Sequence, residues 1–343
     1  MKIVLEKGKL MKTRFISLLL ASVLLAASAA YAEVPEIKIA GGFGITNLPI
    51  MVMERQKLVE KHGKAAGIDV KARFATVAGG ANMNDALLAG AIDVAFPSPT
   101  SFLPLWARTR GTADEVRAVS AVSSMPLVLL TRNPAVKSIR DITDKDKIAV
   151  PSLRVSIQPI LLRIAAAKEW GEKESNRLDA RTVALSHPEA AQAMLSAAGE
   201  ITCHFTSAPY IQMELKKQGV RPILNSYDLL GGPSTFVVAI APAKFVNANP
   251  KVYGAFVAAL KESIDFINRN KREAAEIYLQ ASHDKMSVDE VLAILNDPQV
   301  VFTTVPQNVM VYADFMYKDG MIKVKPDSWR DLFYSNAYNL AGS

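Results

Sequence analysis

Short apolar segments that alternate with helical ones constrain the fold of this chain more than any other sequence feature. In the first third of the sequence, strands are expected at residues 37–40, 69–74 and 93–96, and helices at residues 51–61 and 82–89. Strands joined by single helices in this order predict a parallel sheet with crossover connections. The alternation therefore places the chain in the α/β class.

The same pattern begins again after Ser123-Ser124 and indicates a second α/β unit. Its strands are expected at residues 127–131, 147–150, 181–185, 201–204 and 220–224, and its helices at residues 157–167, 188–197 and 210–217. The chain then continues through Gly231-Gly232-Pro233 into a strand at residues 235–240 and into helices at residues 252–268 and 272–279. A chain of this length exceeds one typical hydrophobic core, so we expect two lobes. Residues 33–123 and 232–343 are assigned to the first lobe, and residues 124–231 to the second.

The N-terminal segment, residues 1–32, has the features of a secretory signal peptide. Lys12 and Arg14 precede an apolar run at residues 15–27, and Ala30-Tyr31-Ala32 supplies a small-x-small cleavage pattern. The apolar run is shorter than the ~20 residues that a membrane-spanning helix needs. We therefore expect cleavage after Ala32 and a soluble periplasmic product. Because no cysteine lies at the cleavage point, no lipid anchor is expected.

Charge and cysteine content argue against several classes of function. The full chain has a formal net charge of +7, but residues 1–32 carry five basic residues and one acidic residue, which leaves +3 for residues 33–343. A surplus this small and unclustered does not favour nucleic acid as a partner, although it permits an anionic small ligand. Cys203 is the only cysteine, so no intramolecular disulfide can form.

One motif combines backbone flexibility with a helix start. Gly79-Gly80 allows a sharp turn and a close approach of backbone amides to a ligand. The helix that follows would direct its unpaired N–H groups and partial positive charge toward the same place. Gly90 ends this helix and Asp93 leads into the next strand. Residues 186–205 repeat the arrangement, with an apolar helix, a glycine stop and a strand.

These residues resemble a known family, the solute-binding proteins of ABC importers in the nitrate/sulfonate/taurine (NitT/TauT) group. That family shares a fold with the thiamine-pyrimidine precursor binders. The resemblance rests on Gly79-Gly80 followed by Asp85-Ala86-Leu87-Leu88-Ala89-Gly90-Ala91-Ile92-Asp93-Val94-Ala95. Ile139-Arg140-Asp141-Ile142 ahead of Lys147–Pro151, and Asn249-Pro250 ahead of the helix at residues 252–268, support it.

The resemblance implies a type II periplasmic-binding-protein fold, with two α/β lobes joined by two crossing strands. A small molecule would be held between the lobes and delivered to a membrane-embedded ABC permease and its ATPase. The resemblance further implies a monomer that closes about a hinge. No cofactor or metal is expected, because no pair among His62, His187 and His283 has metal-ligand spacing.

Open α/β sheets bind ligands at the carboxyl ends of their strands, so the loops after four strands are expected to line the cleft. The candidates in these loops are Phe43, Gly44, Ile45 and Asn47, then Gly79 and Gly80, then Ser98 and Thr100, and, from the second lobe, Ser156 and Gln158. Each type has a structural alternative. Glycines serve turn geometry alone, and a hydroxyl at a helix start serves as a cap.

Arg154 and the stretch that begins at His204 are further candidates in the second lobe. Arg154 lies between a strand and a helix, where a guanidinium would bind a carboxylate or sulfonate; the alternative is an exposed surface arginine. His204 ends the strand expected at residues 201–204, so it is expected to face the loop that follows and to donate a hydrogen bond to a ligand, with Ser207 beside it and Phe205 or Tyr210 stacking on a planar group. The alternative is a buried histidine beside a core phenylalanine.

Three classes of function remain to be weighed. A binding protein agrees with the export signal and the paired α/β lobes, and the candidate residues favour a small organic anion such as a sulfonate or carboxylate. A pyrimidine-precursor binder is an alternative, as is an enzyme on the same fold, although the enzymes carry a cysteine-rich metal motif. A periplasmic ligand-sensing module is the third class, and such modules are usually fused to a membrane span. The sequence favours the binding protein over an enzyme.

Overall fold

The computed structural model describes residues 33–196 and 199–343. All elements given below belong to the compact unit Pro35–Ser343. The predicted signal peptide, residues 1–32, lies outside the described residues, as does the last residue of the helix expected at 188–197.

The first sheet holds six strands of the described chain in the order β11-β4-β10-β3-β1-β2. The strands are β1 (Glu36–Gly41), β2 (Lys71–Thr76), β3 (Val94–Ala95), β4 (Val116–Ser124), β10 (Thr235–Pro242) and β11 (Val301–Phe302). Strands β1, β2 and β3 are parallel, as the alternating pattern predicts. Strand β10 is antiparallel to both β3 and β4 because it carries the chain back from the second sheet. The parallel pairing predicted for the first three strands is confirmed, and the antiparallel strand β10 completes the sheet.

The second sheet holds five strands of the described residues in the order β7-β6-β8-β5-β9. The strands are β5 (Val128–Thr131), β6 (Ile148–Val150), β7 (Thr182–Ala184), β8 (Cys203–Thr206) and β9 (Arg221–Asn225). Strand β6 is parallel to β7 and β8, and β5 is antiparallel to β8 and β9. We call the part of the chain built on the first sheet lobe 1 and the part built on the second sheet lobe 2.

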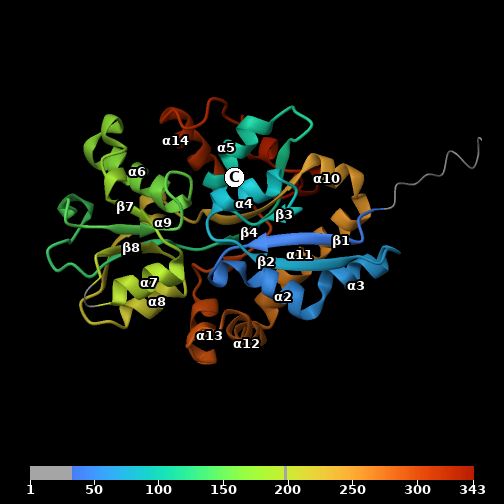
Figure 1. The fold of residues 1–343 in the computed structure, drawn as a ribbon, viewed down its shortest axis with the longest axis horizontal. Helices are drawn as coiled ribbons and strands as arrows, with labels where there is room; N and C mark the ends of the chain where they lie inside the picture. Colours follow the sequence, from blue (N-terminus) through green and yellow to red (C-terminus); the bar gives the residue numbers. More distant parts are fainter. Residues whose placement is uncertain (1–32, 197–198) are drawn as a thin grey trace, which may run out of the picture. The chain divides into compact units, whose positions relative to one another are not determined.

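Helices accompany each sheet (Figure 1). They are α2 (Leu48–Gln56), α3 (Leu58–Ala65), α4 (Gly80–Leu88), α5 (Pro99–Thr109), α6 (Ile157–Trp170), α7 (His187–Leu195), α8 (Tyr210–Leu215), α9 (Ser226–Leu230), α10 (Ala243–Ala248), α11 (Pro250–Arg269), α12 (Lys271–Ser282), α13 (Val288–Asn296) and α14 (Val309–Lys318). Short 3-10 turns are η1 (Ile45–Asn47), η2 (Ile139–Asp141), η3 (Glu172–Glu174), η4 (Asp179–Arg181), η5 (Trp329–Leu332) and η6 (Ser335–Ala337). Across residues 33–196 and 199–343, none of the helices combines the length and apolarity needed to cross a membrane.

Two local expectations differ from the structure. The helix expected at residues 51–61 is two helices, because Lys57 adopts a left-handed conformation with φ 51° and its N–H ends α2 on Glu54 and Met53 carbonyls. The long buried strand β4 was not expected, because its run of valine, alanine and serine lacks the alternation that marks a half-buried strand.

The two segments that connect the lobes are hydrogen-bonded to each other. Ser124 at the end of β4 donates from its hydroxyl to the Ser234 carbonyl at 2.7 Å and lies 2.9 Å from the Tyr227 hydroxyl. Beside them, the Leu127 N–H donates to the Ser226 hydroxyl, and the Ser226 N–H donates to the Leu127 carbonyl, both at 2.9 Å. These bonds bring the outgoing and returning strands together at the place where the chain passes between sheets.

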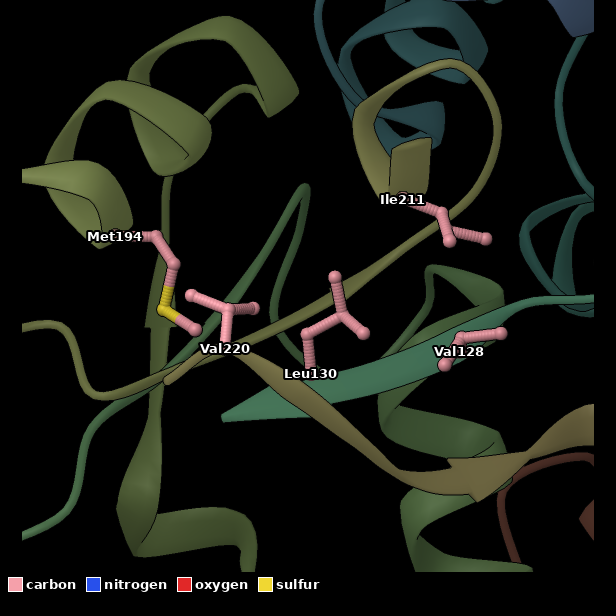
Figure 2. Close-up of a cluster of buried hydrophobic side chains, with 5 residues drawn as sticks. All are labelled: Val128, Leu130, Met194, Ile211 and Val220. Atoms are coloured by element: carbon pink, nitrogen blue, oxygen red, sulfur yellow. The ribbon is translucent and has the colours of Figure 1, made fainter. Parts of the chain in front are cut away.

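An apolar cluster fixes two helices on one face of the second sheet. It consists of Val128, Leu130, Met194, Ile211 and Val220, all buried (Figure 2). The cluster joins β5 to α7 through Met194 and to α8 through Ile211. It therefore holds the end of α7 and the start of α8 over the same face of the sheet.

Candidate functional site

A cavity lies between loops of the two lobes. The space inside it that water can occupy is about 80 Å³, and the empty space between its walls, with the solvent at its mouth, is about 580 Å³. Lobe 1 contributes Gly42, Phe43, Thr46, Asn47, Ala78, Gly79, Gly80, Met83, Phe96, Pro97, Ser98, Ser101, Phe236 and Val237. Lobe 2 contributes Pro151, Ser156, Ile157, Gln158, Ser186 and His187.

The topology explains why these residues meet. Most of them lie just after the carboxyl ends of β1, β2, β3, β6 and β7, which is the edge where open α/β sheets bind ligands. The sequence-based expectation that loops after strands line the cleft agrees with this arrangement. Phe236 and Val237 differ, since they lie within β10 and reach the cavity from the strand itself.

Four helices begin at the cavity wall. Gly79 precedes α4, Ser98 precedes α5, Ser156 precedes α6 and Ser186 precedes α7. The first N–H groups of a helix lack intrahelical partners and carry a partial positive charge, so these ends favour an anion. None of the cavity-lining residues in the described chain is Asp, Glu, Lys or Arg. No carboxylate of the wall therefore opposes the helix ends.

Seven of the thirteen predicted site residues line this cavity and six do not. The seven are Phe43, Asn47, Gly79, Gly80, Ser98, Ser156 and Gln158. The six are Gly44, Thr100, Arg154, His204, Ser207 and Tyr210. Ile45, also expected in the first loop, is fully buried.

Asn47 shapes the first loop rather than offering its amide freely. Its Oδ1 accepts from the Gly42 N–H at 3.1 Å, and its Nδ2 donates to the Phe43 carbonyl at 3.2 Å and to the Thr46 hydroxyl at 3.0 Å. These bonds occupy the donors and acceptor of the amide. Asn47 therefore holds Phe43 and Thr46 in position at the cavity wall.

Several of the other predicted residues form contacts between the lobes. The hydroxyls of Thr100 and Ser101 donate to the Val155 carbonyl at 3.0 and 2.9 Å. A Cβ built on Gly79 would overlap the Ser152 hydroxyl and lie 3.3 Å from the Pro151 carbonyl. Because Gly79 has φ 79° and this close approach, the turn requires glycine for conformation and for space.

Gly44 meets Tyr210 and the Ala208 carbonyl at a second contact between the lobes. A Cβ on Gly44 would lie 3.4 Å from the Ala208 carbonyl and 3.6 Å from the Tyr210 ring. Ser207 is buried, and its carbonyl accepts from the Ile211 N–H at the start of α8. Gly44 and Tyr210 therefore form a lobe contact outside the cavity lining, and Ser207 helps to begin α8.

Arg154 does not reach the cavity wall. Its side chain is exposed and its backbone has φ 69°, in the turn between β6 and α6. The sequence placed it correctly in a loop between strand and helix. The left-handed backbone turns this loop, and the cavity is lined instead by the residues that follow, Ser156 and Gln158.

The expectation that His204 ends its strand and faces the loop that follows is wrong. Strand β8 extends to Thr206 because β5 pairs with it along its full length, with Leu130 opposite His204 and Val128 opposite Thr206. The side chain of His204 is fully buried in the sheet face under α7 and α8. His204 therefore lies behind the cavity wall, not in it.

A chain of hydrogen-bonding side chains leads from the cavity into lobe 2. Gln158 Nε2 lies 3.4 Å from His187 Nε2, His187 Nδ1 lies 2.9 Å from His204 Nε2, and His204 Nδ1 lies 2.5 Å from Glu214 Oε1. The Tyr210 ring stacks on His187 with centroids 5.4 Å apart. The residues come from α6, α7, β8 and α8, and the cluster in Figure 2 packs two of these elements, α7 and α8, against β5.

Burial controls the charge of Glu214, His204 and His187. Removal from water disfavours the charged form of each group. Burial raises the pKa of Glu214 to about 8 and lowers the pKa of His204 to about 3. Burial, together with the neighbouring His204, also lowers the pKa of His187 well below its ordinary value. All three side chains are therefore neutral near pH 7.

Ser186 and His187 are polar cavity residues of lobe 2 that sequence reasoning missed, and Pro151 and Ile157 are apolar ones. The sequence signal for the polar pair was present, because Ser186 and His187 lie between an expected strand and an expected helix. The same position identified the other loops of the site. Ser101 was missed because Ser98 and Thr100 were read as the helix start. Phe236 and Val237 offered no signal, since an apolar pair inside a strand is indistinguishable from core. In the described parts of the chain, no group of three or more His, Cys, Asp or Glu side chains is placed to hold a metal ion.

Solved structures show where this fold occurs elsewhere. The alkanesulfonate-binding protein SsuA from Xanthomonas axonopodis pv. citri, bound to MOPS, superposes with a TM-score of 0.66 at 18% identity, covering 89% of this chain and 98% of that one. The Candida albicans CA3427 gene product, described as having the generic periplasmic binding protein fold, gives a TM-score of 0.67 at 15% identity, with 90% and 99% covered. The periplasmic nitrate-binding protein NrtA from Synechocystis PCC 6803 gives 0.60 at 16% identity, with 79% and 74% covered. These likenesses establish the fold.

A family model settles the relationship at the level of sequence. Comparison with curated proteins finds no match. The model of the NMT1-like family matches residues 30–280, which is more than half of the chain. Family and fold both agree with the resemblance that the glycine-helix motif predicts, and the two α/β lobes are confirmed. The chain therefore belongs to the NMT1-like family and has the periplasmic-binding-protein fold.

Proposed function

We propose that this protein is a periplasmic solute-binding protein that captures a small organic anion between its lobes and delivers it to an ABC importer. The cavity carries the proposal, because four helix starts meet there without a single charged side chain in the lining. Helix N-termini bind anions through backbone N–H groups and the helix dipole. Two of the three structural relatives agree with the role, since they are named as alkanesulfonate- and nitrate-binding proteins.

The proposal also assigns residues to the two lobes and to the hinge between them. Residues 33–123 and 232–343 would form the first lobe, residues 124–231 the second, and the bonded crossing segments at Ser124 and Ser234 the hinge. Gly79 already lies against Ser152 in this structure, so movement at the hinge would part this contact and open the cavity. Export with cleavage after Ala32, action as a monomer and transfer to a permease with its ATPase complete the proposed role. Binding, not catalysis, is the proposed activity.

A thermal-shift screen tests this function directly. Ligands that bind the folded state raise the melting temperature by mass action. We expect MOPS, butanesulfonate, benzoate or nitrate to raise it in a concentration-dependent way, and matched neutral compounds such as benzyl alcohol and butanol to leave it unchanged. Isothermal titration calorimetry then gives the affinity and stoichiometry. If only neutral compounds stabilise the protein, the anion proposal fails.

A variant pair separates the cavity from general stability. Gly79→Ala places a methyl group against Ser152 at the lobe contact, whereas Gly254→Ala adds one in open space on α11. We expect the first variant to lose the ligand-dependent shift and the second to keep it. Equal responses in both variants would show that the ligand binds elsewhere.

A further inference from the structure

The wall of the cavity in lobe 2 contains a directional chain of four side chains. It runs from Gln158 through His187 and His204 to Glu214, and each step is within 3.4 Å. The two histidines meet through Nδ1 of one and Nε2 of the other, so a single proton between them fixes the tautomer of both rings. We call Gln158, His187, His204 and Glu214 the relay.

We infer that the relay fixes His187 as a hydrogen-bond donor into the cavity, so that the site selects ligands with an acceptor-only group such as a sulfonate, carboxylate or nitrate. This inference rests on the proposed binding function and names the side chain that discriminates among ligands. Its mechanism follows from the geometry. A protonated Glu214 donates to His204 Nδ1, His204 Nε2–H then donates to His187 Nδ1, and His187 Nε2–H is left facing Gln158 and the cavity.

The cavity end of the relay has unused hydrogen-bonding capacity. With its Nε2 protonated, His187 faces Gln158 Nε2 at 3.4 Å, and because an amide nitrogen only donates, neither N–H accepts from the other. Both N–H groups are therefore available to a ligand that accepts. A buried donor left without an acceptor is costly, so a ligand oxygen that accepts from both groups gains affinity. His187 and Gln158 thus place two donors side by side at one end of the cavity.

The inner end of the relay explains why Glu214 retains its proton. Its side chain is fully buried, and within the described residues its second oxygen, Oε2, has no hydrogen-bond partner. No basic side chain other than His204 bonds to it in the described chain. An ionised carboxylate in such a place would lack the partners that stabilise it. Glu214 therefore acts as a positioning residue for His187, two groups away.

Other groups face the relay without competing for its protons. Thr206 Oγ1 lies 3.4 Å from His187 Nδ1, and the Tyr210 ring stacks on the His187 ring. Burial, with the nearby Asp284 carboxylate, raises the pKa of Tyr210, so its hydroxyl stays neutral throughout the range considered. Charge in the relay thus changes first at Glu214.

Loss of the Glu214 proton reverses the direction of the hydrogen bonds along the relay. When the carboxyl ionises, it accepts from His204 Nδ1–H, His204 Nε2 accepts from His187 Nδ1–H, and the proton of His187 Nε2 leaves through the cavity. The three side chains then hold two protons in place of three. His187 would present a lone pair to the ligand, and the buried negative charge would repel an anion. The anion affinity should therefore fall above about pH 8.

Nitrogen NMR of the ligand-free protein tests the relay without any ligand. The chain has four histidines, so ¹⁵N-histidine labelling gives a simple spectrum, and His62→Gln and His283→Asn assign the two that lie outside the relay. We expect His187 and His204 both to be neutral Nε2–H tautomers at pH 6.5. A Nδ1–H tautomer at His187, or an imidazolium at His204 paired with ionised Glu214, would overturn the inference.

Variants of Glu214 distinguish a positioning role from a merely structural one. Glu214→Gln can still donate to His204 Nδ1, whereas Glu214→Met cannot. We expect the Nε2–H tautomer of His187 to survive in the first variant at every pH from 6.5 to 9.5 and to be lost in the second. If the two variants give the same tautomer of His187, Glu214 does not direct it.

Calorimetry with benzoate and butanesulfonate links the relay to affinity. His187→Phe keeps a ring against Tyr210 and removes the donor, and we expect it to weaken binding of both probes about tenfold or more, as for a lost bond to a charged group. Wild-type affinity should fall between pH 7 and 9, and that of Glu214→Gln should stay level. Unchanged affinity in His187→Phe would refute the ligand role. If neither probe binds wild type while the tautomers are as expected, the proposed ligand class fails and the relay stands.

Discussion

Replacing Glu214 with glutamine should change how the stability of this protein depends on pH. The folded state holds Glu214 neutral, with burial raising the pKa of its carboxyl to about 8 from an ordinary 4.5. Between these values, the folded protein retains a proton that the unfolded chain has released. The free energy of unfolding therefore falls by about 1.4 kcal/mol for each pH unit gained. This contribution is fully present below pH 4.5 and is lost as the pH rises to 8.

The buried histidines act in the opposite direction. Burial lowers the pKa of His204 to about 3 from an ordinary 6.5 and lowers that of His187 as well. Below pH 6.5 the unfolded chain binds protons that the folded protein excludes, so stability falls as the pH falls. Below pH 6.5, the two histidines change the free energy of unfolding with pH more than Glu214 does. Above pH 6.5, Glu214 is the one group of the three that changes it. The combined contribution is therefore greatest near pH 6.5.

The expected magnitude lies within reach of an ordinary unfolding experiment. From pH 6.5 to pH 8, the wild-type protein should lose about 2 kcal/mol of unfolding free energy through Glu214, and Glu214→Gln should lose none of this part. Urea unfolding followed by circular dichroism at pH 5.5, 6.5, 7.2, 8 and 9 measures both proteins. Groups common to both proteins cancel in the comparison. Parallel curves for the two proteins between pH 6.5 and 8 would refute a neutral, buried Glu214.

Three further substitutions probe other parts of the structure. Gly79→Ala should weaken binding of benzoate or butanesulfonate at least tenfold in calorimetry, because its methyl group overlaps Ser152 at the lobe contact; affinity equal to that of Gly254→Ala would contradict this. Ser124→Ala should lower the unfolding free energy by about 1–3 kcal/mol, since the Ser234 carbonyl loses its buried donor, and a loss below 0.5 kcal/mol on urea titration would argue against that bond. Leu130→Ala should cost about 2–5 kcal/mol by the same measurement, because it opens a cavity under α7 and α8; an unchanged midpoint would show that the cluster in Figure 2 does not support these helices.

The class of fold could be predicted from the sequence because its signals are local. The spacing of apolar residues and the glycine stops identified β1, β3, β5 and β6 to within one residue at each end, whereas the helix expected after β1 is two helices and α5 was not expected. The same rules failed where tertiary pairing decided the outcome. Strand β8 begins two residues later than expected and continues through Thr206, because β5 supplies hydrogen-bond partners that no local pattern reveals.

The candidate site was predicted in part for the same reason. Loops after strands can be found in the sequence, and they supplied Phe43, Gly79, Ser98, Ser156 and Gln158. Which side of a strand faces a cavity cannot be found in this way. The sequence pointed to His204 as a ligand contact, and the structure places it one layer behind His187.

The sequence by itself determined the α/β class, the family and the edge of the sheets where a ligand would bind. Each of these follows from periodicity, turn residues and motif spacing, which act over a few neighbouring positions. Only the tertiary structure decided that four helix starts converge on one cavity and that His187, His204 and Glu214 form a relay. Those residues lie on α7, β8 and α8, and their meeting depends on the packing of two helices on a sheet face. The charge state of the relay depends on burial, which is a property of the assembled fold and not of any segment.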